Sequence, residues 1–328
     1  IDTWNMAFTN LVVKNHIVPA NHSLLGRNIN TMLMYNSLIL NCRGEGNNAA
    51  LLEAKALPFD PSRVMSQRNM FISNVGFAHG GVWRISASNF TDSESLYLSN
   101  YAEVMGGGIF ATDGTRAQIS QSEFYGNSAK KLGGVLVSTS EAIVELIKVE
   151  ARKNGRWLNP SSLSENILGK QFSAEFDDFL SIYKDFYSGS EELLNFADTF
   201  SDSIFEGFSI MKKMDIGTLL EEVKASQINS MISSAEPIER GGAFAVSQEG
   251  SLSIIQSNII ENVSVSSSAA DCESSLRSQF IIKDSTIERN EVSEAHGLAT
   301  LRFISCVGQL SKVIIRNNIA SKATGGIY

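Results

Sequence analysis

Residues 122–137 read SEFYGNSAKKLGGVLV, and residues 69–83 read NMFISNVGFAHGGVW. Both stretches contain an aromatic residue, an asparagine three positions later, and two glycines six and seven positions after that asparagine. A third copy lies between them, with Tyr97 in the aromatic position. Three copies of one pattern indicate an internal repeat, which decides the architecture before any other feature. The matched residues are Phe71, Asn74, Gly80 and Gly81; Tyr97, Asn100, Gly106 and Gly107; and Phe124, Asn127, Gly133 and Gly134.

The repeat continues on both sides of these copies with a period of mostly 26 to 28 residues. One longer step of 33 residues separates Asn41 from Asn74. The last copy ends in Gly325 and Gly326, about one residue out of step with the others. The positions of the repeated asparagine predict about nine rungs, marked by Asn15, Asn41, Asn74, Asn100, Asn127, Asn154, Asn262, Asn290 and Asn318.

Each copy contains short runs of alternating or β-branched apolar residues, such as the stretch 119–124 and the stretch 280–282. Such runs, separated by Gly, Asn and Ser, are typical of short strands. One unit of this size cannot bury its apolar face alone, but units stacked about 4.8 Å apart can. The sequence therefore predicts an all-β solenoid, a right-handed parallel β-helix with a helical insertion.

The repeated asparagines and glycines have a structural explanation in such a fold. An asparagine tolerates left-handed backbone angles and can hydrogen-bond the asparagines of the rungs above and below. Paired glycines permit a tight corner, or a close approach of stacked backbones that a Cβ would block. We therefore interpret both motifs as architecture and not as a ligand site.

The combination F-x-x-N followed by G-G-A-[ILV] resembles the repeats of the polymorphic outer-membrane protein family, which have a pectin-lyase-like fold. The resemblance rests on the three copies above, on Gly241-Gly242-Ala243-Phe244 and on Gly325-Gly326-Ile327-Tyr328. It implies a large surface-exposed or secreted β-helix, such as a bacterial adhesin or a cell-surface protein of some protists. It implies no catalytic residues.

One long segment departs from the repeat. After Asn154 the glycine pair is due near residue 160, but Gly241 and Gly242 arrive 81 residues late. The intervening residues include apolar side chains at helical spacing, among them Phe172, Phe176 and Phe179. We therefore expect three regions: N-terminal rungs over 1–156, an acidic α-helical insertion over 157–236, and C-terminal rungs over 237–328.

The expected insertion has 14 Asp and Glu against 5 Lys, a net charge of −9, whereas the whole chain has −8. Acidic residues on amphipathic helices form either a solvated surface or a docking surface. The docking alternative predicts a protein partner or self-association, lateral or end-to-end. The negative sign disfavours nucleic acid and anionic membranes as partners.

The chain has no apolar run long enough to span a membrane, so we expect no direct membrane insertion in this segment. It opens within a strand pattern and stops in mid-repeat, as expected of a piece of a longer protein. The three cysteines, Cys42, Cys272 and Cys306, are too few for a disulfide scaffold. We interpret them as buried small apolar residues, with pairing of Cys272 and Cys306 left open.

Three N-glycosylation sequons begin at Asn21, Asn89 and Asn262. They are compatible with a secreted glycoprotein but do not establish one. Because Asn262 also occupies the repeated asparagine position, we expect its side chain to turn into the stack.

An enzyme is the main rival, because many parallel β-helices cleave polysaccharides with carboxylates clustered on one wall. His22, His79 and His296 fall in separate rungs, and the only local acidic pair is Asp271 with Glu273. No basic or metal-binding companion is expected one rung away from that pair. The sequence thus favours a non-enzymatic extracellular or cell-surface structural or adhesin-type protein without cofactor or metal. The alternatives are a carbohydrate-active enzyme, or a glycan-binding β-helix with an exposed wall that carries Trp83 or aromatic neighbours.

Overall fold

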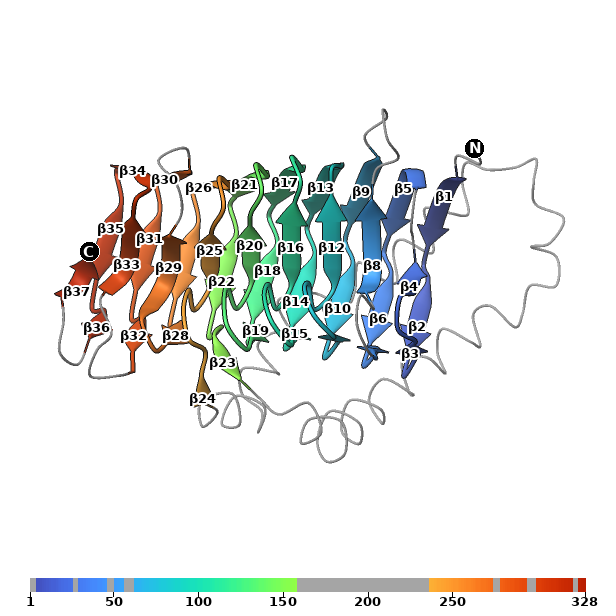
Figure 1. Cartoon of the computed structure of the whole chain (residues 1–328), viewed down its shortest axis with the longest axis horizontal. Coiled ribbons are helices and arrows are strands. Elements are labelled where there is room, and N and C mark those ends of the chain that lie inside the picture. Colours follow the sequence, from blue (N-terminus) through green and yellow to red (C-terminus); the bar gives the residue numbers. More distant parts are fainter. Residues whose placement is uncertain are drawn as a thin grey trace, which may run out of the picture. The chain divides into compact units, whose positions relative to one another are not determined.

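The computed structural model describes residues 4–25, 29–45, 50–55, 62–157, 236–273, 278–293, 299–320 and 324–328. These residues form a parallel β-helix whose successive turns stack along one axis (Figure 1). Each full turn passes through three long sheets, called wall 1, wall 2 and wall 3 here, with nine strands each among the described residues. The predicted all-β solenoid of about nine rungs is confirmed.

The strands of each sheet pair in register with the strands one turn before and after. Wall 1 consists of β1 (Trp4–Thr9), β5 (Ile29–Tyr35), β9 (Arg63–Gln67), β13 (Asn89–Ser93), β17 (Arg116–Ser120), β21 (Ile143–Ile147), β26 (Ser251–Ile255), β30 (Gln279–Lys283) and β34 (Val307–Ser311). Wall 2 consists of β2 (Val12–Lys14), β6 (Leu38–Leu40), β10 (Met70–Ile72), β14 (Leu96–Leu98), β18 (Glu123–Tyr125), β22 (Glu150–Arg152), β27 (Asn258–Ile260), β31 (Thr286–Glu288) and β35 (Ile314–Arg316).

Two-residue strands follow wall 2 in most turns and lead to wall 3. They are β3 (Ile17–Val18), β7 (Arg43–Gly44), β11 (Val75–Gly76), β15 (Tyr101–Ala102), β19 (Ser128–Ala129), β28 (Val263–Ser264), β32 (Glu291–Val292) and β36 (Ile319–Ala320). Wall 3 consists of β4 (Ser23–Leu25), β8 (Ala50–Lys55), β12 (Trp83–Ser86), β16 (Ile109–Thr112), β20 (Leu136–Ser138), β25 (Phe244–Val246), β29 (Ser267–Glu273), β33 (Ala299–Ile304) and β37 (Thr324–Ile327).

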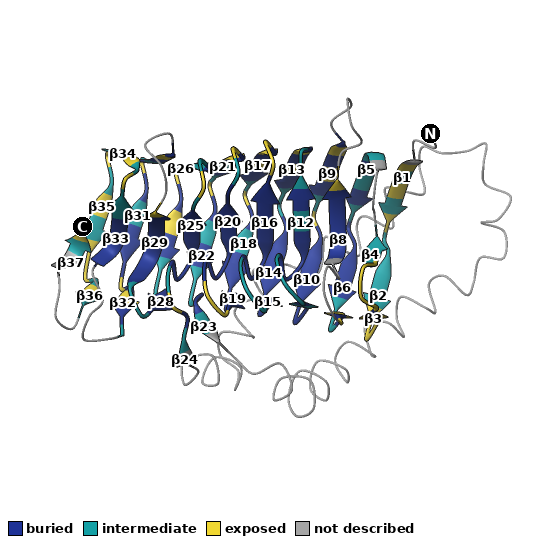
Figure 2. Cartoon of the chain, viewed as in Figure 1, coloured by how far each residue is buried: buried dark blue, intermediate teal, exposed yellow. Residues whose placement is uncertain are grey.

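The core fills the space enclosed by the three walls, because alternate side chains of each strand point inward. In the middle turns the inward side chains of wall 2 are aromatic: the ring of Tyr97 lies 4.8 Å from that of Phe71 and 4.5 Å from that of Phe124. Trp83 joins them from wall 3, with its ring 6.1 Å from Phe71, and is fully buried. The glycan-binding alternative expected Trp83 on an exposed wall, but this side chain is buried in the core. Figure 2 shows the buried strands of these middle turns.

The repeated asparagines form a continuous ladder at the corner after wall 2. The backbone N–H and the Nδ2 of Asn100 both donate to Oδ1 of Asn127, each at 3.0 Å. Nδ2 of Asn100 also donates to the carbonyl of Phe71 at 2.8 Å. In this ladder, the asparagine of each turn accepts hydrogen bonds from the buried backbone N–H and side-chain amide of the turn before it. Its members are Asn74, Asn100, Asn127, Asn154, Asn262, Asn290 and Asn318.

The left-handed residue of this corner is not the ladder asparagine but the residue before it, such as Ser73 and Ser99, each with φ 52°. In the second turn, the backbone N–H of Cys42 donates to Oδ1 of Asn74, so Cys42 occupies the ladder position. Asn15 and Asn41, with φ of 55° and 50°, are therefore left-handed residues one position before the ladder. The prediction that they mark the ladder was wrong by one residue.

A second ladder, which we did not predict, lies at the corner between wall 1 and wall 2. The hydroxyl of Ser122 accepts the backbone N–H of Ser95, and the hydroxyl of Ser95 accepts that of Asn69. Ser285 and Ser257 repeat this contact near the C-terminus. Here too a left-handed residue precedes each ladder position, as Arg68, Glu94 and Gln121 show in the middle turns.

The two glycines of each pair have different roles at the corner before wall 3. Gly106 has φ 69°, a left-handed angle that glycine adopts without the strain of a Cβ. A Cβ on Gly107 would lie 2.2 Å from the carbonyl oxygen of Gly134 in the next turn. The tight corner requires the first glycine, and the close approach of stacked backbones requires the second. The pairs Gly80–Gly81, Gly133–Gly134 and Gly241–Gly242 repeat this geometry.

The β-helix continues across the long interruption of the repeat. Strand β22 pairs directly with β27, and Asn154 donates to Asn262, which is 108 positions later in the chain. The interrupted turn contains β23 (Arg156–Trp157) and β24 (Glu236–Pro237), which pair antiparallel. The predicted acidic α-helical insertion over 157–236 lies outside the described residues, except for Trp157 and Glu236 at its ends.

Candidate functional site

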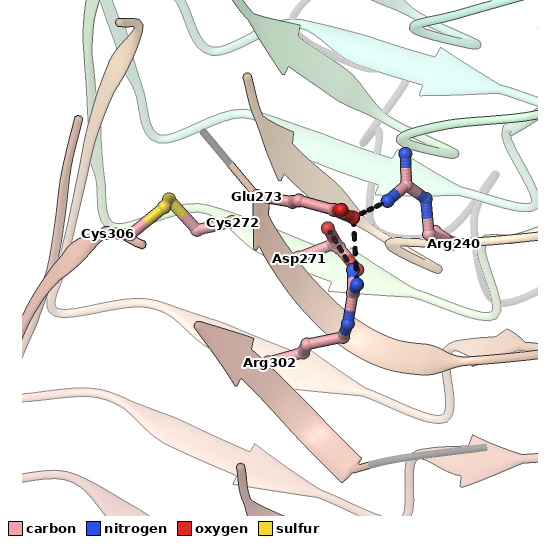
Figure 3. Close-up of a disulfide and its surroundings, with 6 residues drawn as sticks. All are labelled: Arg240, Asp271, Cys272, Glu273, Arg302 and Cys306. Carbon is pink, nitrogen blue, oxygen red and sulfur yellow. Dashed lines mark hydrogen bonds and ion pairs between the residues drawn. A yellow bond between two sulfur atoms is a disulfide. The ribbon is translucent and has the colours of Figure 1, made fainter. Parts of the chain in front are cut away.

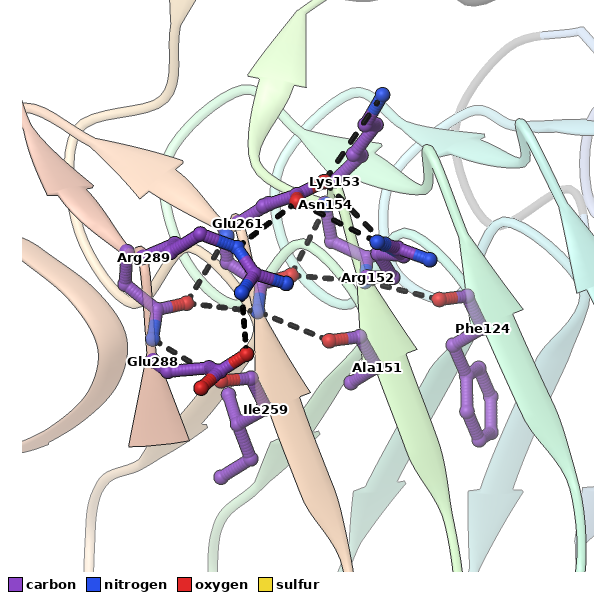
Figure 4. A network of polar contacts seen from close by, with 11 residues as sticks. Phe124, Ala151, Arg152, Lys153, Asn154, Ile259, Glu261, Glu288 and Arg289 are labelled. Atoms are coloured by element: carbon purple, nitrogen blue, oxygen red, sulfur yellow. Dashed lines mark hydrogen bonds and ion pairs between the residues drawn. The ribbon is translucent and has the colours of Figure 1, made fainter. Parts of the chain in front are cut away.

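A charged corner follows wall 2 in the C-terminal half of the β-helix. Glu261 is its centre: Arg152 donates to it from the preceding turn, with Nε 3.2 Å from Oε2. Arg289 donates to it from the following turn at 3.1 Å, and Nζ of Lys153 lies 3.9 Å away (Figure 4). Glu288 continues the series by pairing with Arg289 and with Arg316. We call these six residues the charged corner.

The arginines hold the acids of the charged corner in the ionised form. Burial by itself raises the pKa of Glu261, but the contacts with Arg152, Arg289 and Lys153 bring that pKa below its usual value. Hydrogen bonding to Arg316 lowers the pKa of Glu288. Both carboxylates are thus committed to neighbouring cations and are poor general acids at neutral pH.

A second polar group, called the C-terminal cluster, contains Asp271, Glu273 and Arg302 of wall 3 and Arg240, which lies at the corner before this wall. Asp271 is directly paired in register with Arg302 of the next turn. Nη1 of Arg302 lies 2.8 Å from Oδ2 of Asp271, and Nη2 of Arg302 lies 2.8 Å from Oε2 of Glu273. Arg240 also pairs with Glu273, as Figure 3 shows. The expectation that the Asp271–Glu273 pair lacks a basic companion one rung away was wrong.

A disulfide joins Cys272 of β29 to Cys306, which lies in the turn between β33 and β34 (Figure 3). Their Cα atoms are 6.2 Å apart, a normal separation for a disulfide. The pairing that the sequence left open is thus formed, and the interpretation as a buried small apolar residue without a disulfide holds for Cys42 alone among the three cysteines. Cys42 is buried and unpaired, and burial raises the pKa of its thiol.

Asp92 is a buried carboxylate inside the middle turns. It lies on the core side of β13, between the hydroxyls of Ser95 and Ser122, which donate to it at 2.8 Å and 3.1 Å. Burial raises the pKa of Asp92 to about 6, although these hydroxyls and Tyr97 oppose the rise. Because Asp92 is enclosed in the core, it has no route to a substrate on an outer wall.

The histidines do not gather into a site among the described residues. The ring of His79 stacks on Phe110 of β16, with centroids 4.6 Å apart. Burial, followed by the charge of Arg84, lowers the pKa of His79. His22 is exposed and contacts the carbonyl of Ala20 in a turn. His296 lies outside the described residues.

The three sequons differ in accessibility. Asn89 and Thr91 are exposed on the outer face of wall 1, on either side of the buried Phe90. Asn21 is exposed in a turn and has φ 61°. Asn262 is fully buried in the ladder.

Within the described ranges, no group of three or more His, Cys, Asp or Glu is arranged to hold a metal ion. The same ranges contain no helix long and apolar enough to cross a membrane. The polar groups that do assemble are ladders and ion pairs between successive turns, and such contacts bind turn to turn.

Comparison with known proteins finds no match: no family model, no curated protein and no solved structure is significantly similar to this chain.

The ladder asparagines from Asn74 onward and the glycine pairs could be recognised in the sequence. The C-terminal cluster and the disulfide were missed because the distance between Asp271 and Arg302 depends on the register of wall 3. That register shifts between Ser267 and Ala270.

Proposed function

We propose that the protein is a non-enzymatic structural or adhesin-type β-helix that acts outside the cell or at its surface. It presents a stiff surface for assembly or adhesion. The observation that carries this proposal is the asparagine ladder, which runs without a break from Asn74 to Asn318. A ladder in a buried corner, added to three parallel sheets, opposes bending between turns.

The disulfide supports the proposed location. Disulfides persist in oxidising environments such as the extracellular space and the lumen of the secretory pathway. The Cys272–Cys306 bond links β29 to the turn that follows β33, the next strand of wall 3, in a region with fewer aromatic core residues. This location agrees with what the resemblance to polymorphic outer-membrane protein repeats implies.

The proposed partner is another protein or a second copy of this chain, recognised through the acidic segment between β23 and β24. The net charge of −9 over 157–236 gives that segment a charge sign distinct from the rest of the chain. Glycans stay a further proposed class of ligand.

A loop replacement tests this role. Because β23 and β24 pair antiparallel, with Trp157 opposite Glu236, residues 158–235 can be replaced by a two-residue Asn-Gly turn. Sedimentation velocity and cell-binding assays would compare this variant with the full chain, with circular dichroism and thermal unfolding as folding controls. We expect the full chain to associate or adhere and the folded variant to lose that activity. Equal association by both proteins would reject the role of the segment.

The rival proposal, a polysaccharide lyase or hydrolase, requires carboxylates that are free to exchange protons or bind a cation beside the substrate. Asp271 and Glu273 are instead held by Arg302 and Arg240, and Glu261 is held by cations of both neighbouring turns. These ion pairs support the structural proposal over the enzymatic one.

A further inference from the structure

The geometry points to Asn89 as an N-glycosylated residue of this protein and to Asn262 as a sequon that stays unmodified. The inference rests on the extracellular location in the proposed function, since N-glycans are added in the lumen of the secretory pathway. It goes beyond that function because it assigns a covalent modification to one wall of the β-helix.

Asn89 has the accessibility that the modification requires. It is exposed at the start of β13, and Thr91, the third residue of the sequon, is exposed on the same face of the strand. Residues i and i+2 of a strand share a face, so the amide and the hydroxyl lie together on the outer side of wall 1. The buried Phe90 between them anchors the strand in the core, with 1% of its surface exposed. A glycan on Asn89 would therefore extend into solvent without disturbing the core.

Asn262 has the opposite environment. Its Nδ2, the atom that would carry the sugar, donates to Oδ1 of Asn290 at 3.0 Å and to the carbonyl of Ala151 at 3.0 Å. Its Oδ1 accepts two hydrogen bonds from Asn154. A glycan on this nitrogen would remove one of these donors and could not fit within a fully buried corner.

The proposed reaction uses a lipid-pyrophosphate-linked oligosaccharide as the donor. The bond that forms joins Nδ2 of Asn89 to the anomeric carbon of the first sugar. The bond that breaks joins this carbon to the pyrophosphate oxygen, which leaves with the electron pair, and the amide nitrogen loses one proton. The product places a bulky hydrophilic group between Arg63 and Arg116, the neighbours of Asn89 on adjacent strands. Wall 1 would then be screened from lateral packing, and contacts between copies would use other faces.

The test is expression of the full chain through a eukaryotic secretory pathway, followed by glycopeptide mapping before and after enzymatic removal of N-glycans. We expect the Asn89 peptide to be glycosylated and the Asn262 peptide to be unmodified. Asn89→Gln and Thr91→Val should each remove one glycan from the intact mass, whereas Thr91→Ser should keep it. Both positions are exposed, so the variants should fold, and secretion with the disulfide formed provides the check.

A secreted, disulfide-bonded chain with an unmodified Asn89 would overturn the inference and leave the proposed location intact. A glycan on Asn262 of the folded protein would overturn it as well. Retention of the chain inside the cell with Cys272 and Cys306 reduced would reject the proposed location and the inference with it.

Discussion

The middle turns and the C-terminal turns of the β-helix share one backbone path but are held together by different side chains. In the middle turns, stacked aromatic rings fill the core and glycine pairs form the corner before wall 3. In the C-terminal turns, Ser267 and Ser268 take the place of the glycines, and the register of wall 3 shifts beside them. There the disulfide and the buried Arg302–Asp271 pair connect successive turns.

The difference shows which part of the repeat the two regions share. The asparagine ladder runs through both regions, from Asn74 to Asn318, although Cys42 occupies its position in the second turn. In the middle turns the second glycine of each pair lies where stacked backbones approach too closely for a Cβ, whereas a Cβ on Gly326 at the C-terminal end would have no atom within 4 Å. Where the strand shifts its register, as at Ser267, the corner accepts larger residues.

The largest expected effect is that of Gly107→Ala in the middle turns. The new Cβ would lie 2.2 Å from the carbonyl oxygen of Gly134 and 2.3 Å from that of Ser128, both of which are backbone atoms. We expect a loss of more than about 4 kcal/mol in the free energy of unfolding, or failure to fold. Gly114→Ala is the matched control: Gly114 has φ 70° but no atom within 4 Å of its added Cβ. It should cost about 1 kcal/mol; equal losses in denaturant unfolding would contradict the steric explanation.

The next effect is expected from breaking the ladder at its centre. Asn127→Ala leaves the backbone N–H and the Nδ2 of Asn100 without their acceptor in a fully buried corner. We expect a loss of about 3–4 kcal/mol in the free energy of unfolding. Asn318→Ala removes the same contacts from Asn290 in a partly exposed turn and should cost about 1–2 kcal/mol. Similar losses for the two variants would mean that burial does not decide the strength of the ladder.

The disulfide is expected to act locally, on the C-terminal turns. It closes a loop with a sequence separation of 34, for which chain entropy gives about 2–4 kcal/mol of stabilisation. Replacing Cys272 and Cys306 by alanine should speed hydrogen exchange in β33, β34 and β37 and leave β14 and β18 unchanged. Faster exchange throughout the β-helix would show that the two regions are not independent.

The smallest expected effect is a stabilisation, which results from removing the buried charge of Asp92. The pKa of Asp92 is about 6 in the folded protein against 3.8 without the fold, so the folded state binds the proton more tightly. Stability is therefore highest below pH 3.8 and falls as the pH rises through about 6. Asp92→Asn should raise the free energy of unfolding by about 1–3 kcal/mol at pH 7.5 and change it little near pH 4.

Asp271→Asn sharpens this result, because Asp271 is also buried but faces Arg302. Removing its charge leaves the buried guanidinium with Glu273 as its remaining acidic partner, so the variant should be destabilised at pH 7.5. Chemical denaturation across this pH range would measure both variants. We expect Asp92→Asn to stabilise the protein and Asp271→Asn to destabilise it. Stabilisation by both variants, or by neither, would contradict the explanation that Asp92 is a buried charge without a cationic partner and that Asp271 is paired with Arg302.

The fold was predictable because its strongest signals recur at fixed spacing. Phe71, Asn74 and Gly80 have counterparts one turn later at Tyr97, Asn100 and Gly106, and this spacing alone implies stacked turns. The second ladder, at the corner between wall 1 and wall 2, was not predictable in the same way. Its positions contain Asn69, Ser95 and Ser122 but also Val149, so no single residue type marks that corner.

The polar groups of the candidate site could not be read from the sequence because they depend on the register between turns. The sequence pattern aligns Asn41 with the ladder asparagines, but the structure places Cys42 at that position. This error of one residue shifts every inferred neighbour in the first two turns. At the C-terminal end, the register shift beside Ser267 conceals that Asp271 faces Arg302. Pairing of Cys272 with Cys306 depends on the same shift.

The most direct test of the proposed function uses the secreted, oxidised full chain and a panel of neutral and acidic polysaccharides. Light scattering after size-exclusion chromatography would follow the polysaccharide length and the mass of the protein in the same sample. We predict unchanged polysaccharide length, together with assembly of the protein or its retention on a ligand. Shortened polysaccharide, with loss of that activity in Asp271→Asn or Glu273→Gln, would contradict the proposal and identify the C-terminal cluster as a catalytic site.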